Sequence, residues 1–114
     1  MKIQAYRFGT MTVDNQAHVH DLKIIDGIVA PRWWRREGHT VSPGDIDDVL
    51  AATPRYLVVG TGQPGRMRVD AELAGMFAEL GIELIEEPTD QAIHTFNRLL
   101  QDGRKVAGAF HLTC

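Results

Sequence analysis

The stretch "YLVVGTGQPG", residues 56–65, joins a continuous apolar run to a loop that contains three glycines. A run such as "YLVV" is typical of a strand that is covered on both faces of a sheet. The glycines have the spacing G-x-G-x-x-G, which is the spacing of a dinucleotide-binding loop. The stretch therefore predicts a buried parallel strand, and it raises the question of whether the loop after it holds a nucleotide.

The chain downstream of this strand predicts two helices and two further strands. Apolar residues at helical spacing indicate one helix over residues 70–81 and a second from Thr89 or Asp90 to Gly103. The apolar segments "IELI" (residues 82–85) and "KVAGAFHL" (residues 105–112) predict the strands. This β-α-β-α-β order predicts parallel strands that are joined by right-handed crossovers.

The first forty residues have the period of two that is typical of half-buried strands. "TMTV" (residues 10–13), "AHVHDLKII" (residues 17–25) and "IVAPRWW" (residues 28–34) are predicted as extended runs that form an antiparallel meander. Asp26-Gly27 predicts a tight hairpin turn. A short helix is predicted to begin at a Ser42 cap and to end at Pro54.

These patterns predict an α/β fold in a single domain, residues 1–114, with an N-terminal antiparallel β meander followed by a C-terminal β-α-β-α-β parallel unit. The length of 114 residues fits one domain and gives a core without disulfides.

The composition and net charge disfavour some classes of binding partner and some cellular locations. A net charge of −3 gives no overall positive field for nucleic acid or anionic lipid. The lone cysteine, Cys114, favours a reducing compartment, and neither a signal peptide nor a membrane span is predicted. We therefore expect a cytoplasmic chain with no membrane partner and no cofactor, monomeric or weakly homo-oligomeric.

The glycine loop departs from a dinucleotide loop in two ways. Pro64 removes one N–H donor, and "RMRV" (residues 66–69) alternates like an extended segment, so the helix cap at Asp70 lies several residues beyond the glycines. The chain also has room for only one mononucleotide-binding half. Glu86 and Glu87, near the position of a ribose-binding acid, favour a nucleotide. A turn is the preferred interpretation, and a small-anion site is the alternative, with Gly60, Thr61, Gly62 and Arg66 as its candidate residues.

Other reactive side chains suggest sites that the sequence alone does not complete. Ser42 is the only serine and fits a helix cap rather than a hydrolase nucleophile. His18 and His20 would share one strand face, and His39 is the obvious third ligand, but exposed histidines without metal are the preferred interpretation. For His111 and Cys114 we expect packing at the chain terminus.

The segment "RWWRREGH", residues 32–39, interleaves tryptophan with arginine. On a strand, Trp33 and Trp34 would point to opposite faces, so one would be core and the other a surface anchor. Tryptophan and arginine dominate protein–protein hot spots, and therefore a protein interface is favoured over single-stranded nucleic acid at Arg32–Arg36. Asn97, which is an unfavourable residue within a helix, is a further candidate for binding a loop or facing a cleft, but a solvated helix face shared with His94 is the preferred interpretation.

Several segments together resemble one small family of uncharacterised domains. They are "FGTM", "DLKI", "WWRREGH", "LVVGTG", "FNRLLQDGRKVAGAF" and "HLTC", in that order and over nearly the whole chain. The family includes the adipogenesis-associated domain protein of animals and, more distantly, a mitochondrial complex I assembly factor. The positions that match its pattern are Trp34, Gly38, His39, Gly60, Thr61, Gly62, Asn97 and Gly103.

The resemblance implies a three-layer α/β domain, in which a central mixed sheet contains the parallel unit and the N-terminal β meander packs against it. It implies no established catalytic residues or cofactor. Binding or assembly roles are hypotheses for the eukaryotic relatives, so a non-enzymatic domain with a protein partner is the leading hypothesis. The alternative is an enzyme or binder of a small anionic metabolite, which would use the loop Gly60–Arg66 and His39 or His94 as acid and base. Nucleic-acid binding through Arg32–Arg36 is the third and least favoured hypothesis.

Overall fold

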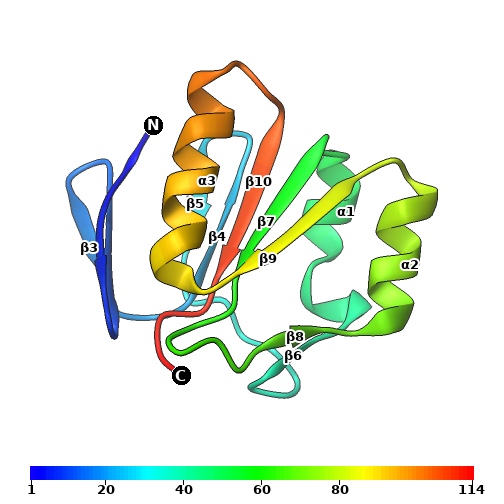
Figure 1. Cartoon of the computed structure of the whole chain (residues 1–114), viewed down its shortest axis with the longest axis horizontal. Helices are drawn as coiled ribbons and strands as arrows, with labels where there is room; N and C mark the ends of the chain where they lie inside the picture. Colours follow the sequence, from blue (N-terminus) through cyan, green and yellow to red (C-terminus); the bar gives the residue numbers. More distant parts are fainter.

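A five-stranded mixed sheet lies at the centre of the molecule (Figure 1). A computed structural model describes residues 1–114. The strand order is β5-β4-β10-β7-β9, in which β10, β7 and β9 are parallel and β4 and β5 are antiparallel to their neighbours. The strands are β4 (Leu22–Ile25), β5 (Ile28–Ala30), β7 (Tyr56–Gly60), β9 (Glu83–Glu87) and β10 (Val106–Phe110).

Both faces of this sheet are covered, which makes three layers (Figure 1). An antiparallel sheet and helix α3 cover one face, whereas α1, α2 and a short parallel strand pair lie on the other. The first layer contains β1 (Ile3–Arg7), β2 (Thr10–Val13), β3 (Gln16–His18) and α3 (Thr89–Gln101). The other contains β6 (Thr40–Val41), η1 (Pro43–Asp45), α1 (Asp47–Ala52), β8 (Arg68–Val69) and α2 (Ala71–Glu79). The predicted α/β architecture is confirmed.

Strand β7 shows why its sequence is a continuous apolar run. Val58 is buried against α3 and the antiparallel sheet β1-β2-β3, which we call the small sheet. Leu57 and Val59 are buried on the side of α1 and α2. Each fully buried side chain of this size contributes about 1.5–3 kcal/mol. On the α3 side, Phe96 and Phe110 meet edge to face with their centroids 5.7 Å apart. None of the helices has the length and apolar character needed to cross a membrane.

The predicted meander is only partly correct. "AHVHDLKII" is not one strand, because β3 belongs to the small sheet and β4 to the central sheet. The polar residues of Val19–Asp21 interrupt the apolar alternation where the chain passes from one sheet to the other. The run "IVAPRWW" ends at Ala30 because Pro31 cannot donate to a strand ladder and Arg32 has a φ of 56°.

Two predicted helix starts also need correction. The segment after Ser42 forms a 3₁₀ turn, with a capping box between Ser42 and Asp45, before α1 begins at Asp47. In α3, Pro88 occupies the cap position, whereas Thr89 and Asp90 lie inside the helix. Thr89 is not a cap because its hydroxyl group bonds the glycine loop and the C-terminal tail, residues 111–114.

Gly108 on β10 is expected to tolerate no side chain. A Cβ atom there would lie 2.7 Å from Phe110 Cζ and 3.1 Å from Phe96 Cδ1, inside a closed core. Gly108→Ala should therefore lower the free energy of unfolding by about 1–3 kcal/mol. Gly75→Ala on exposed α2, where a Cβ has open space, should instead raise it by about 0.5–1 kcal/mol. Urea unfolding of both variants tests this, and equal midpoints would contradict the packing described.

Candidate functional site

The carboxyl ends of the parallel strands meet at one end of the molecule. Phe110 of β10 lies opposite Gly60 of β7, and Gly60 lies opposite Glu87 of β9. Strand β4 starts and β5 stops at the same end, because Leu22 pairs with Phe110 and Lys23 pairs with Ala30. We call this end the carboxyl-end surface. It is formed by residues 8–9, 19–21, 31–39, 61–68 and 111–114.

Most backbone N–H groups of the glycine loop donate hydrogen bonds to other segments of the same chain. The N–H of Thr61 donates to Glu87 O at 2.9 Å, and that of Gly62 donates to Thr89 Oγ1 at 2.9 Å. The tail accepts two more bonds, Gln63 N–H to Thr113 O and Arg66 N–H to Cys114 O. Most of the loop amides that a small-anion site at Gly60–Arg66 would use are therefore already hydrogen-bonded.

The helix that follows the loop is kept apart from it, as the sequence predicted. Strand β8 intervenes, and α2 begins only at Ala71. The helix start that lies beside the loop is instead that of α3, where Thr89 N–H donates to Gly62 O at 3.0 Å. A dinucleotide loop needs the next helix to begin within its glycines, and this loop does not have that geometry.

Gly60 and Gly62 are required for close packing. A Cβ on Gly60 would lie 2.9 Å from both Phe110 Cδ1 and Thr89 Oγ1. Gly62 has a φ of 100°, and a Cβ there would lie 2.7 Å from His111 Cδ2 and would overlap Thr113 O. These two glycines of the predicted site thus let the loop, α3 and the tail approach one another.

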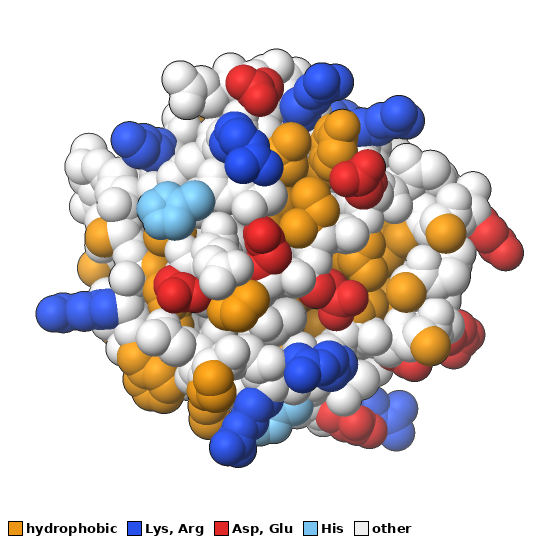
Figure 2. Space-filling view, in the orientation of Figure 1, with side chains coloured by type: hydrophobic (Ala, Val, Ile, Leu, Met, Phe, Trp, Pro, Cys, Tyr) orange, Lys and Arg blue, Asp and Glu red, His pale blue; other side chains and the backbone are white.

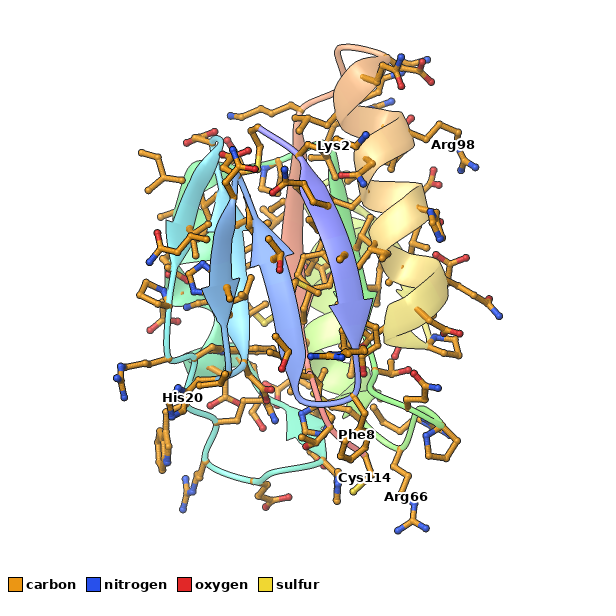
Figure 3. All side chains as sticks on the ribbon, turned by 90° about the vertical axis from the view of Figure 1, so that its left-hand side faces the viewer. Lys2, Phe8, His20, Arg66, Arg98 and Cys114 are labelled. Carbon is orange, nitrogen blue, oxygen red and sulfur yellow. The ribbon has the colours of Figure 1, made fainter.

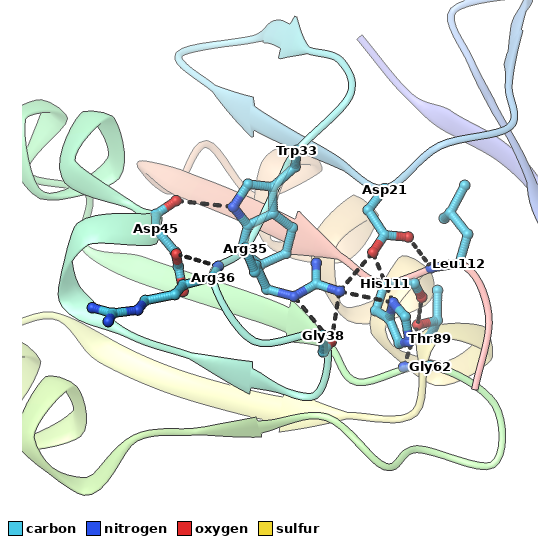
Figure 4. A network of polar contacts seen from close by, with 10 residues as sticks. All are labelled: Asp21, Trp33, Arg35, Arg36, Gly38, Asp45, Gly62, Thr89, His111 and Leu112. Carbon is cyan, nitrogen blue, oxygen red and sulfur yellow. Dashed lines mark hydrogen bonds and ion pairs between the residues drawn. The ribbon is translucent and has the colours of Figure 1, made fainter.

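A buried polar network lies next to the loop (Figure 4). Asp21 Oδ2 lies 2.8 Å from Arg35 Nη2 and 2.7 Å from His111 Nδ1, and Asp21 Oδ1 accepts the N–H of Leu112 at 2.8 Å. Arg35 also donates to Gly38 O and stacks over the ring of Trp33 at 4.5 Å. Arg35 and His111 are both more than nine-tenths buried.

The hydrogen bonds of this network indicate which of its groups carry protons. Burial by itself raises the pKa of Asp21, but hydrogen bonds from His111, Leu112 and Arg35 outweigh burial and bring that pKa below its ordinary value. Asp21 is therefore an ionised acceptor, and the Nδ1 atom of His111 carries the hydrogen that bonds it. Two buried nitrogen atoms, His111 Nε2 and Arg35 Nη1, have no hydrogen-bond partner.

The predicted site residues do not form one site. Thr61 is buried at the loop, whereas Arg66 and Trp34 are exposed on the carboxyl-end surface. His39 is exposed, its carbonyl accepts the N–H of Arg68 at 2.9 Å, and its ring lies edge-on to that of His111 at 5.8 Å between centroids. Asn97 lies on α3, where its amide group bonds both the N–H and the carbonyl of Ile3 and so fastens β1 to the helix.

A cavity of about 390 Å³ opens beside the glycine loop. It is lined by polar and charged residues from the loop and from the end of β9, and neither His39 nor His94 reaches it. The Arg68 guanidinium is turned to the carbonyls of Gly65 and Met67. The lining residues are Thr61, Gly65, Arg68, Glu86, Glu87 and Pro88. No cluster of three or more His, Cys, Asp or Glu side chains has the arrangement of a metal site.

The sequence analysis did not identify Asp21, and it treated Arg35 and His111 only as parts of other patterns. The partners of Asp21 are far apart in the chain, since His111 lies 90 residues from it and 76 residues from Arg35. A polar residue directly before a buried strand was the only local signal at Asp21, and that signal names no partner.

Comparisons with known proteins agree on the fold. A family model described as "Protein of unknown function (DUF498/DUF598)" matches residues 3–111. The conserved hypothetical protein PH1505 of Pyrococcus horikoshii OT3 is similar, with 26% identity, a TM-score of 0.80 and 100% of both chains covered. XCC1710 of Xanthomonas campestris has 23% identity and a TM-score of 0.84, covering 96% of this chain and 83% of its own. A Bartonella henselae protein described as an outer membrane protein has 24% identity and a TM-score of 0.81, with 98% and 94% covered.

Asp21→Asn should destabilise the protein in a pH-dependent manner. The variant removes the charge between Arg35 and His111 and should lower the free energy of unfolding by about 3 kcal/mol at pH 7. A carboxyl group whose pKa is lowered by folding stabilises the fold above its unfolded pKa, and this contribution is lost as the pH falls through the folded value. The difference from the wild type should therefore shrink as the pH falls below about 4.

Urea unfolding at pH 7 and at pH 3 measures this effect. Asp26→Asn, in the exposed β4–β5 turn, is the matched control, because Asn-Gly suits the same turn and its stability should stay within about 0.5 kcal/mol of the wild type. The account of the network would be wrong if both variants had the stability of the wild type at pH 7.

Proposed function

We propose that this chain, which belongs to the DUF498/DUF598 family of proteins of unknown function, is a non-enzymatic domain that binds another protein through its carboxyl-end surface. One observation carries the proposal: 77% of Trp34 is exposed between two neighbours that are buried, Trp33 and Arg35. A large apolar side chain in this position gives little to the fold and is well placed to enter a partner's pocket.

Hydrogen bonds hold the backbone on both sides of Trp34. The indole N–H of Trp33 donates to Asp45 O at 2.9 Å, and the backbone N–H of Trp33 donates to Asp21 O at 2.7 Å. On the other side, Arg35 is fixed by Asp21 and Gly38. Because the backbone of Trp34 is held on both sides, binding a partner would cost little loop entropy.

The surroundings of Trp34 fit a protein interface. Phe8 and Val19 of the same surface are 58% and 66% exposed, and Arg36 and Arg66 are exposed there as well. Phe8, His20, Arg66 and Cys114 gather at one end of the molecule, opposite Lys2 and Arg98 (Figure 3). Hydrophobic and basic side chains also lie next to one another along the lower edge of Figure 2. Aromatic residues and arginine together are the composition of interface hot spots.

The two alternative functions have less support from the geometry. A small-anion site on Gly60–Arg66 would need loop amides that already donate to Thr113 O and Cys114 O. A stacking platform for nucleic acid at Arg32–Arg36 would need both tryptophans, and Trp33 is buried. We therefore place protein binding first.

The resemblance to the family of the adipogenesis-associated protein and the complex I assembly factor supports the same choice, because binding or assembly is what is hypothesised for those relatives. A cytoplasmic location belongs to the proposal as well, and the lone cysteine supports it.

Trp34→Ala should weaken partner binding strongly. We would immobilise the wild-type chain, recover a partner from the native host, and measure the purified pair by calorimetry. Loss of a buried tryptophan anchor should weaken the complex at least about thirtyfold. Ile28→Ala is the matched control, because Ile28 is 71% exposed but lies at the opposite end of the central sheet, in the β4–β5 hairpin.

A partner that binds Trp34→Ala as tightly as the wild type, or that is lost with Ile28→Ala instead, would contradict the proposal. Thermal unfolding of both variants is the accompanying control. The native fold does not require the exposed Trp34 ring, so both should unfold close to the wild-type temperature.

A further inference from the structure

We propose that the groove between strand β3 and the segment that follows β5 binds carboxylate groups of an acidic protein segment. This inference rests on the proposed function and deepens it, because the segment would belong to the same partner. The groove has a volume of about 310 Å³. It is lined by Gln16, Ala17, His18, Val19, His20, Pro31 and Arg32.

The groove lies where the edge of the small sheet at β3 faces the segment that follows β5, residues 31–32. Strand β3 is the outer strand of the small sheet, and β5 is the outer strand of the central sheet. His18 lies opposite Met11, which is completely buried, so the His18 side chain is on the inner face of the small sheet, toward this gap. Figure 3 looks at this side of the molecule, with His20 at the carboxyl-end surface.

The charge of the lining is one-sided. Its ionisable residues are His18, His20 and Arg32, and it contains no carboxylate group. None of these three side chains has a hydrogen bond or an ion pair within the protein, in contrast to Arg35 and Arg68. The carboxylate of Asp21 follows His20 in the chain, but it is bonded to Arg35 and His111 and does not neutralise the positive charge of the groove.

Arg32 is held in position by its neighbours. Its φ of 56° is uncommon for a residue with a side chain, and Pro31 restricts the chain before it. After it, Trp33 is buried and bonded to Asp21 O and Asp45 O. The guanidinium group therefore extends from an anchored backbone and can bind a carboxylate with two parallel N–H bonds.

The remaining lining favours a protein segment over a nucleic acid. Val19, Ala17 and Pro31 give the groove apolar surface for the side chains between acidic residues. The lining has no Phe, Tyr or Trp ring for bases to stack on, and stacking is the main source of affinity for single strands. An acidic segment with interspersed apolar residues matches both the charge and the apolar part.

The test is an NMR titration of ¹⁵N-labelled protein with a tetraglutamate peptide at pH 6. Shifts of backbone amide signals should be confined to residues 16–20 and to Arg32. Arg32→Gln should weaken binding about tenfold or more, whereas Arg104→Gln, an exposed arginine in the α3–β10 turn, should have no effect.

Two results would overturn the inference. One is tetraglutamate binding that Arg32→Gln leaves unchanged or that shifts other residues. The other is a twelve-nucleotide oligo-dT strand that shifts the same residues at lower concentration than the peptide, which would assign the groove to nucleic acid. Preserved dispersion of the Arg32→Gln spectrum shows that the variant is folded.

The two proposals fail separately. Tetraglutamate should bind Trp34→Ala as it binds the wild type, because Trp34 does not line the groove. Peptide binding without any Trp34-dependent partner would uphold the groove and overturn the proposed function. A Trp34-dependent partner that Arg32→Gln binds as tightly as the wild type would uphold the proposed function and overturn the groove.

Discussion

The carboxylate of Asp21 is the point on which the carboxyl-end surface depends. It accepts bonds from Arg35, from His111 and from the N–H of Leu112, so it joins the start of β4, the segment after β5 and the tail after β10. Three ionisable groups are withdrawn from water here, and burial alone would make that unfavourable. The arrangement is stable because both carboxylate oxygens are bonded, which also holds the pKa of Asp21 low.

This network lies beside the carboxyl ends of the parallel strands, which is where α/β proteins often bind their ligands. In open α/β sheets, ligands bind where neighbouring strands lead to opposite faces of the sheet. Here β7 leads to α2 and its neighbour β9 leads to α3, on opposite faces of the sheet. Beside Gly60, at the end of β7, the chain fills the space with Gly62, Thr89 and the tail. The glycines therefore serve a close approach of backbone to backbone. The side chains that are free to bind a partner lie at the edge of the carboxyl-end surface, where the anchored segment after β5 exposes Arg32 and Trp34.

Most of the fold could be predicted from local sequence patterns. The helical spacing of apolar residues over 70–81 predicted α2, Asp26-Gly27 predicted the β4–β5 turn, and the apolar run Tyr56–Val59 predicted a doubly covered strand. The partition of residues 17–25 between two sheets could not be predicted, because both strands have the same alternation and differ only in their pairing partners. The candidate site was harder still: Trp34 was singled out as one of two alternatives, and Asp21 was not singled out at all.

The sequence by itself determined the C-terminal parallel unit with its two helices, the turn between β4 and β5, and the separation of the glycine loop from the helix that follows it. Periodicity, turn residues and proline act over a few neighbouring positions, and these properties depend on nothing else. Only the tertiary structure decided which tryptophan is buried, that the tail occupies the loop amides, and that the edge of the small sheet and the segment after β5 enclose a cationic groove. Each of these depends on residues far apart in the chain, such as Asp21 and His111, 90 positions apart, and no local pattern encodes such a meeting.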